Sequence, residues 1–272
     1  MKTKIFLIII TIMMILSSCR NNDKNNVYTN DDEVVNNAEN KVENNANTDN
    51  SGKKVIELDF TSVDKEVLIE SQPDEMWILG KSFYFGNIPN QIESKIHLYV
   101  ENSNDSYAKP GDGIVYGFLE HDNKMYDLGE LSYYGIDSVD VNLIDRTFDE
   151  IKEIEITGEM GAAYRELRII TYDESNKEWL NLLTMGSPKI VDLDEDGQEE
   201  LIAISTGSVD IYKWNNDSFE KSSITKEAEN VYASLYLLDN KWVIETGLVE
   251  EDKTSNPTLY KYENGKLVEM YE

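Results

Sequence analysis

The sequence predicts an all-β fold of antiparallel strands, and three observations favour it. From Val55 onward, short runs alternate apolar and polar residues, as in Lys95 to Val100, which is the period-2 pattern of a strand with one buried face. Gly, Asn and Asp separate the runs, as they do at tight turns between strands. No long stretch has the 3.6-residue period of a helix. Helix should therefore be a minor component, with Thr147 to Lys152 as its most favourable short segment.

The composition limits the classes of partner and of structural support. The chain has 272 residues, and its 25 basic and 53 acidic residues give a formal charge of −28. Nucleic acid is a poor partner, because a polyphosphate backbone requires a basic face. The hydrophobic fraction of 40% and the 16 Tyr are enough to fill a sizeable core. One Cys and two His exclude both an internal disulfide framework and a Cys/His zinc cluster.

The N-terminus has the features of an export signal. Lys2 and Lys4 precede Ile5 to Leu16, a run of twelve residues that is apolar except for Thr11. This run is too short to span a bilayer, which requires about 20 residues. It ends in Leu16-Ser17-Ser18-Cys19, which resembles the bacterial lipobox.

This resemblance implies that residues 1–18 are a lipoprotein signal peptide and that Cys19 is diacylated, with acyl chains such as palmitate. The mature chain would then be anchored by lipid to the outer face of a cell membrane, because two or more acyl chains anchor stably. A free thiol that follows an ordinary cleavage site is the alternative.

A flexible stalk is predicted between the lipid and the folded part. Residues 20–54 contain twelve Asn and, among large apolar side chains, only four Val and one Tyr. Such a segment cannot bury enough surface to offset the entropy lost on ordering. We therefore assign residues 19–54 to the lipidated Cys and a disordered Asn-rich stalk, and residues 55–272 to the folded domain.

The folded part contains an internal repeat. An aromatic strand, a polar turn and a second strand recur with equivalent positions at Ile114, Ile169, Ile211 and Leu259, at spacings of 55, 42 and 48 residues. A strand that ends in Thr-Gly precedes the hairpin in two of these copies, at Gly158 and Gly207, and Trp242 to Gly247 is a candidate for a third. Such spacings suit four-stranded blades and give about four of them. The expected architecture is a small or incomplete β-propeller, and a closed ring, an open array and a generic antiparallel domain all remain possible.

One segment carries recognisable chemistry. Residues 192–200 read Asp-Leu-Asp-Glu-Asp-Gly-Gln-Glu-Glu and lie between two predicted strands. Carboxylates at positions 1, 3 and 5 can turn inward together, Gly at position 6 permits a sharp bend, and position 7 offers a backbone carbonyl. This pattern predicts a Ca²⁺ site, with Mg²⁺ as a weaker candidate and a solvated acidic turn as the alternative. The predicted ligands are Asp192, Asp194, Asp196, the carbonyl of Gln198, and Glu200.

The flanks of this segment distinguish two kinds of calcium loop. An EF-hand needs a bidentate Glu at position 12 and helices on both sides, but position 12 is Ala203 and the flanks alternate as strands. Residues 187–219 resemble the FG-GAP or VCBS repeat of integrin-type β-propellers. That resemblance implies an ion that pins two strands of a blade. In the preceding copy Asp140, Asn142 and Asp145 are irregularly spaced and Arg146 intrudes, so we expect no ion there.

Other catalytic signals are weak. No Gly-x-Ser-x-Gly elbow accompanies His97 or His121, so the sequence gives no support to a serine hydrolase. Pairs of acids suited to glycosidases are uninformative, because so acidic a domain places some pairs at that separation in any fold. Four Trp could pack within blades or line a sugar or peptide groove, and core packing is the ordinary use of a large ring. They are Trp77, Trp179, Trp214 and Trp242.

The leading functional hypothesis is an extracytoplasmic lipoprotein. Its folded part would be a calcium-stabilised, β-propeller-like binding module without enzymatic activity, for a protein or polysaccharide ligand. A calcium-dependent hydrolase of cell-wall polymer or polysaccharide is one alternative. A sensor or assembly factor for a membrane protein is another, which an exposed apolar patch would favour.

Overall fold

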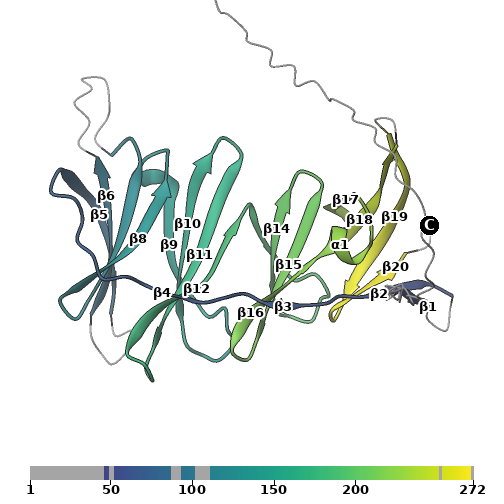
Figure 1. The fold of residues 1–272 in the computed structure, drawn as a ribbon, viewed down its shortest axis with the longest axis horizontal. Helices are drawn as coiled ribbons and strands as arrows, with labels where there is room; N and C mark the ends of the chain where they lie inside the picture. The colour runs from purple at the N-terminus through teal and green to yellow at the C-terminus, as the bar shows by residue number, and fades with distance from the viewer. Residues whose placement is uncertain (1–45, 49–51, 87–92, 102–110, 251–252, 271–272) are drawn as a thin grey trace, which may run out of the picture. The chain divides into compact units, whose positions relative to one another are not determined.

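Four antiparallel sheets follow one another along the folded unit, Asn44–Glu272 (Figure 1). The computed structural model describes residues 46–48, 52–86, 93–101, 111–250 and 253–270. The predicted signal peptide, Cys19 and most of the predicted stalk lie outside the described residues. The prediction of an all-β, antiparallel fold is confirmed.

Each sheet is built from four consecutive strands that run up and down beside one another. The first sheet contains β5 (Trp77–Phe85), β6 (Ser94–Glu101), β7 (Val115–His121) and β8 (Lys124–Ser132). The second contains β9 (Val139–Ile144), β10 (Glu153–Gly161), β11 (Tyr164–Asp173) and β12 (Glu178–Gly186). The third contains β13 (Pro188–Val191), β14 (Glu200–Ser205), β15 (Ser208–Asn215) and β16 (Ser218–Ser223). The fourth contains β17 (Tyr232–Leu238), β18 (Lys241–Glu250), β19 (Lys253–Glu263) and β20 (Lys266–Glu269). The four aromatic hairpins of the sequence repeat form the third and fourth strands of these sheets.

Helix is confined, within the described residues, to η1 (Ile136–Ser138) and α1 (Ile224–Glu227). The predicted helical turn at Thr147 to Lys152 is wrong. The Asp145 carboxylate accepts hydrogen bonds from the N–H groups of Asp149 and Glu150, so these donors are not available to a helix. Phe148 and Glu150 also have positive φ angles, of 57° and 68°, which bend the segment into a loop between β9 and β10.

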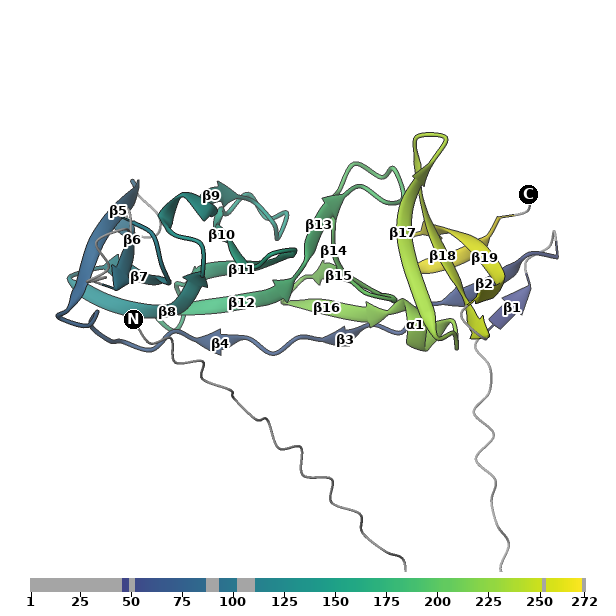
Figure 2. The same ribbon diagram turned by 90° about the horizontal axis from the view of Figure 1, so that it is seen from above.

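An extended N-terminal segment crosses the outer edges of all four sheets. We call residues 54–70 the strap. Within it, β2 (Lys54–Glu57) pairs with β20, β3 (Thr61–Ser62) with β16, and β4 (Glu66–Val67) with β12, before Glu70 bridges to Tyr126 of β8. The strap thus pairs with the sheets in reverse order, from the fourth to the first (Figure 2). A further strand, β1 (Ala46–Thr48), pairs with β2, so strand pairing begins ahead of Val55.

Three apolar clusters fill the spaces between successive sheets. The first two sheets share a cluster that includes Ile96, Leu119 and Ile154, and the last two share one that includes Ile202 and Ile211. The second and third sheets are therefore buried on both faces. On β11, for example, Ile169 and Ile170 are both buried but belong to different clusters. The middle cluster includes Leu167, Leu183, Leu201 and Phe219.

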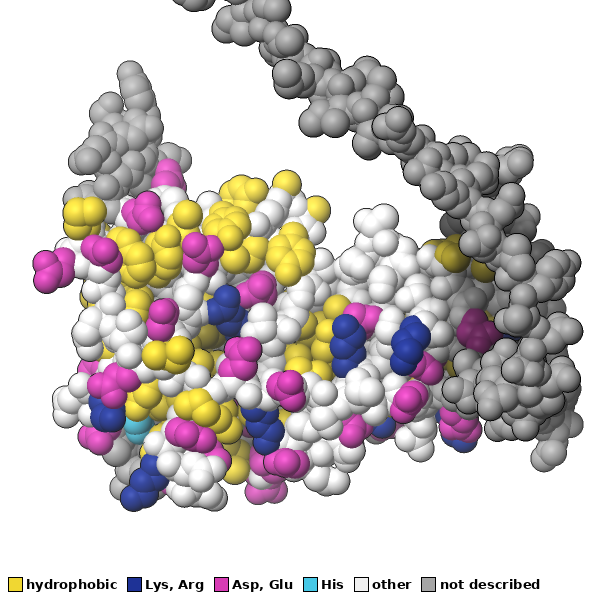
Figure 3. Space-filling model, viewed as in Figure 1, with side chains coloured by type: hydrophobic (Ala, Val, Ile, Leu, Met, Phe, Trp, Pro, Cys, Tyr) yellow, Lys and Arg dark blue, Asp and Glu magenta, His cyan; other side chains and the backbone are white. Residues whose placement is uncertain are grey.

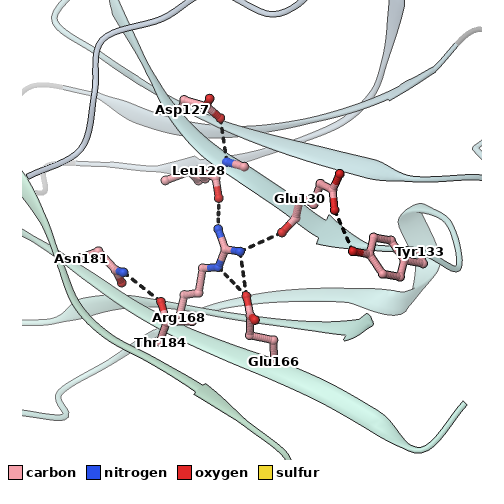
Figure 4. A network of polar contacts seen from close by, with 9 residues as sticks. Asp127, Leu128, Glu130, Tyr133, Glu166, Arg168, Asn181 and Thr184 are labelled. Carbon is pink, nitrogen blue, oxygen red and sulfur yellow. Dashed lines mark hydrogen bonds and ion pairs between the residues drawn. The ribbon is translucent and has the colours of Figure 1, made fainter. Parts of the chain in front are cut away.

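Arg168 joins the first two sheets by a polar network (Figure 4). The pairing of β7 with β8 shifts register twice, near Leu128 and near Leu131. The Arg168 guanidinium, which extends from β11, donates to the carbonyls of Leu128 and Glu130, the second at 2.9 Å, and to the carboxylate of Glu166 at 2.7 Å. The arginine thus supplies hydrogen-bond donors to a strand with an irregular ladder.

Candidate metal centre

The acidic loop, residues 192–200, connects β13 to β14 in the third sheet. The Asp192 carboxylate accepts hydrogen bonds from the N–H groups of Asp196, at 3.1 Å, and Gly197, at 3.0 Å. Asp196 in turn accepts from the N–H of Gln198 at 2.7 Å. Gly197 has a φ of 91°, a conformation that glycine adopts without a Cβ penalty. These contacts fold the segment into a tight loop.

Three carboxylates converge at the base of this loop. One oxygen from each of Asp192, Asp194 and Glu200 lies within 4.8 Å of the others. Glu200 is buried, and the other two residues are half-buried. One Asp194 oxygen accepts from the N–H of Asn264 at 3.0 Å, but Oδ1 is buried and has no hydrogen-bond partner. A buried, unsatisfied carboxylate oxygen is costly, so this geometry calls for a cation or a proton.

The electrostatics of the loop agree with this geometry. Burial raises the pKa of Glu200 to about 7, and the charges of Asp194 and Asp196 act in the same direction. The N–H of Leu193, which donates to Glu200 at 2.8 Å, opposes that shift. Burial also raises the pKa of the nearby Tyr262 hydroxyl, with the charges of Glu200 and Asp194 as the next largest cause. Negative potential is therefore concentrated where a cation would stabilise the ionised acids.

The structure brings together three of the five predicted ligands. Asp192, Asp194 and Glu200 form the cluster, whereas Asp196 is exposed and lies outside it. The side chain of Gln198 is exposed, and the role of its carbonyl stays a prediction. Three hard oxygen donors, one of them without a partner, fit Ca²⁺ better than a soft metal that prefers sulfur or imidazole. Asp192, Asp194 and Glu200 would hold the ion. Among the residues that the structure describes, they form the only group of three or more Asp, Glu, His or Cys so arranged.

A second loop in the described chain repeats this backbone pattern without the acidic cluster. We call residues 145–153 the sister loop; it connects β9 to β10 in the second sheet. Its Asp145 accepts from the N–H groups of Asp149 and Glu150, and Asp149 accepts from Ile151 at 2.9 Å. These positions match the acidic loop after a shift of 47 residues. Positions 1, 5 and 9 are acidic in both loops.

The two loops differ at positions 2 and 3. Position 3 of the sister loop is Thr147, whose hydroxyl donates to Glu153 at 3.1 Å, so the carboxylate at position 9 gains a neutral donor in place of a second acid. Position 2 is Arg146 where the acidic loop has Leu193. The buried Arg146 pairs with Glu155 at 2.7 Å and with Glu199 of the acidic loop at 2.9 Å. The sister loop thus satisfies its own carboxylates.

Sequence reasoning did not find the sister loop as such. It aligned the preceding copy from Asp140, whereas the structure aligns it from Asp145. The spacing of Asp145, Asp149 and Glu153, which equals that of Asp192, Asp196 and Glu200, is the signal that could have shown the correct register.

A polar row on the first sheet was also missed. The Ser82 hydroxyl lies 2.8 Å from His97 Nδ1, and His97 Nε2 lies 2.7 Å from Glu120. Ser82 and His97 are direct cross-strand partners on β5 and β6. The hydrogen bond from His97 lowers the pKa of Glu120, and Lys95 adds to that effect. Because an ionised carboxylate only accepts hydrogen bonds, Nε2 carries a proton, and in the neutral form of the imidazole Nδ1 accepts from Ser82.

The four Trp occupy different environments. Trp179 is fully buried and contacts His121 and Tyr172, so it packs in the core as expected. Trp77 stacks on Tyr116 with ring centroids 3.9 Å apart. Trp242 is half-buried beneath the ammonium of Lys189, and Trp214 packs against Phe219.

Comparison of the chain with models of protein families and with curated proteins finds no match. The likeness to FG-GAP or VCBS repeats therefore stays a prediction that rests on the acidic loop and its flanking strands. No helix in the described part of the chain is long and apolar enough to cross a membrane.

Proposed function

We propose that this chain is a lipid-anchored extracytoplasmic protein whose folded unit is a calcium-stabilised binding module. One observation carries the proposal: Asp192, Asp194 and Glu200 converge, and a buried Asp194 oxygen has no partner. The sister loop strengthens the argument, because Thr147 supplies a hydrogen bond where the acidic loop has only carboxylates. The role of the ion is structural, since it would offset the repulsion among acids that join two strands of one sheet.

The finer fold that we propose is an incomplete β-propeller. The supporting observations are the four-stranded up-and-down sheets, their succession along the chain and the apolar clusters between neighbours. In Figures 1 and 2 the first and fourth sheets lie at opposite ends of the row, which favours the open form over a closed ring.

The test of the ion is thermal unfolding of the full chain in detergent, with calcium and with chelator. A ligand at 100 times its Kd stabilises by about 2.7 kcal/mol, which for a domain of this size raises Tm by roughly 5–10 °C. Asp194→Thr places a hydroxyl where the sister loop has one. We therefore expect calcium to cause no rise in the Tm of this variant, and its Tm in chelator to exceed that of the parent.

Asp145→Ala is the matched control for this test. It removes the equivalent loop hydrogen bonds from the sister loop, so it should lower Tm but keep the calcium shift. A parent chain whose Tm does not change up to about 100 mM calcium, which is about 100 times the weakest Kd of extracellular calcium modules, would refute the proposed ion.

The lipid anchor has a separate test. The chain has one cysteine, so mass spectrometry of the mature protein reports on a single candidate site. We expect a diacylated Cys19 in the parent and no lipid in Cys19→Ala. An unlipidated parent isolated from its native membrane would contradict the anchor.

A hydrolase is the second candidate, and the row of Ser82, His97 and Glu120 favours it. His97 Nδ1 could take the Ser82 proton as the hydroxyl attacks an acyl carbon. None of these three side chains lines the cavity beside the acidic loop or the two larger cavities, which weakens this candidate. The test is labelling by a fluorophosphonate. If Ser82 is labelled in the parent and not in His97→Asn, the chain is a hydrolase and the proposal of a binding module without enzymatic activity is wrong. Ser94, which bonds to the buried His121 at 2.9 Å, is the control serine.

An exposed apolar surface favours the third candidate, a sensor or assembly factor for a membrane protein. Apolar side chains gather over the first two sheets on the face shown in Figure 3. Ile78, Leu79 and Tyr84 of β5 are among the exposed large hydrophobic residues of the first sheet. Such a surface can contact another protein.

A further inference from the structure

A small cavity lies beside the acidic loop. Its volume is about 160 Å³, below the range of pockets for drug-sized ligands and of the scale of a single ring. Its lining comes from separate parts of the fold. The acidic loop contributes residues that include the proposed ion ligands Asp194 and Glu200, β15 contributes Trp214, the turn after β19 contributes Asn264, and the sister loop contributes Phe148. The cavity therefore lies where the two loops meet the third and fourth sheets.

Phe148 is an unusual residue in this position. Its side chain is 49% exposed, and its φ of 57° is a conformation that bulky residues rarely adopt. Neither burial nor backbone preference accounts for a phenyl ring here, so the ring is held in the cavity wall at a local cost. The ion pair from Arg146 to Glu199 ties the sister loop to the acidic loop and fixes the two walls relative to each other.

The polar lining is predominantly acidic. Asp194, Asp196, Glu199 and Glu200 offer acceptors, whereas Lys213 and the side-chain amides of Gln198 and Asn264 offer donors. The Lys213 ammonium sits 4.0 Å above the ring of Phe60, which holds it in place. A calcium ion would neutralise Asp194 and Glu200, and Arg146 pairs with Glu199, which leaves Asp196 and Lys213 as opposed charges. A neutral ligand that both donates and accepts hydrogen bonds suits such a lining.

We propose that this cavity binds one pyranose ring of a neutral sugar, with Phe148 and Trp214 against its apolar face and the polar lining around its hydroxyls. The inference rests on the proposed function, because two of the proposed ion ligands, Asp194 and Glu200, also line the cavity. A hexose of this size should bind weakly, with a Kd on the order of millimolar.

Saturation-transfer NMR on the full chain in detergent tests the proposal. The probes are D-glucose, D-galactose and N-acetyl-D-glucosamine, each in calcium and in chelator. We expect at least one of them to receive saturation, and Phe148→Ala to weaken its binding about fivefold. Tyr84→Ala removes an exposed ring from the first sheet, away from the cavity, and is the control that should leave binding unchanged.

The outcomes separate this proposal from the proposed function. Saturation of none of the three sugars, or equal binding by the parent and Phe148→Ala, overturns the sugar site. Saturation of tetramethylammonium or glucuronate in place of the sugars also overturns it. A rise in Tm with calcium but no sugar binding leaves the ion and removes the sugar site. Sugar binding without a rise in Tm removes the ion, and with it the argument for a neutral ligand that depends on the ion.

Discussion

Asp194 and Glu200 bring two carboxylates together in a place where one oxygen has no hydrogen-bond partner. In the sister loop the same two positions hold Thr147 and Glu153, and a hydroxyl donates to the acid. Thr147, together with Arg146 at position 2, thus distinguishes a self-satisfied loop from one that needs a cation or a proton. The fold supplies both versions on neighbouring sheets, which makes each a control for the other.

The pH dependence of stability distinguishes the cation from the proton. Burial raises the folded-state pKa of Glu200 from 4.5 to about 7, so the folded chain holds a proton that the unfolded chain has released. This stabilisation is present in full below about pH 4.5 and is lost as the pH rises through about 7. The difference between the two pKa values corresponds to about 3 kcal/mol in the free energy of unfolding.

In chelator, urea unfolding should therefore show lower stability at about pH 8 than at about pH 5, and calcium should reduce the difference. Glu200→Gln should remove this contribution from the profile in chelator. It should leave those of Glu153, whose pKa burial raises, and of His121, whose pKa burial lowers, with the opposite sign. A parent profile that is flat in chelator would count against this account of Glu200.

The sequence identified the acidic loop because its residues are contiguous and their order has a direct chemical meaning. It did not reveal that Asp196 and Gln198 stay at the surface, since that depends on how Asp192 is engaged by backbone N–H groups. The sister loop escaped detection because Thr147 and Arg146 replace the acidic and apolar residues of the pattern. Their roles depend on Glu153, Glu155 and Glu199 and appear only in the folded chain.

Among the elements, β8 depends on a side chain from the next sheet. Arg168 donates to two carbonyls of β8 and to Glu166, and its side chain is only 21% exposed. Arg168→Met should leave those acceptors without their donor and lower the free energy of unfolding by about 3 kcal/mol. Arg165, on the same strand, forms an exposed pair with Asp140 at 3.1 Å. Arg165→Met should therefore cost less than about 1 kcal/mol in the same denaturant titration. Equal losses for both variants would refute the role given to Arg168.

The repeated hairpins were predictable and the strap was not, for a physical reason. Each hairpin is a local unit, with an apolar alternation on both strands and a polar turn between them. The strap pairs through two-residue strands such as β3 and β4, whose side chains are exposed, with partners more than a hundred residues away. Backbone pairing of this kind leaves no periodic pattern in the side chains.

At the scale of the whole folded unit, the two loops connect neighbouring sheets in series. Arg146 links the second sheet to the acidic loop of the third, and Asp194 links that loop to the turn at Asn264 in the fourth. Leu193 extends the acidic loop into the apolar cluster between the third and fourth sheets. An ion in this loop would therefore stabilise contacts among three sheets. Its removal should lower the Tm of the whole folded unit in a single cooperative transition.

The central claim is most directly tested by calorimetric titration of the full chain, in detergent, with calcium. The account predicts one ion bound per chain, with a Kd of about 10⁻⁴ to 10⁻³ M, which is the range of calcium sites in extracellular modules. Binding should disappear in Asp194→Thr and persist in Asp145→Ala. Absence of binding by the parent at millimolar calcium, or undiminished binding by Asp194→Thr, would contradict it.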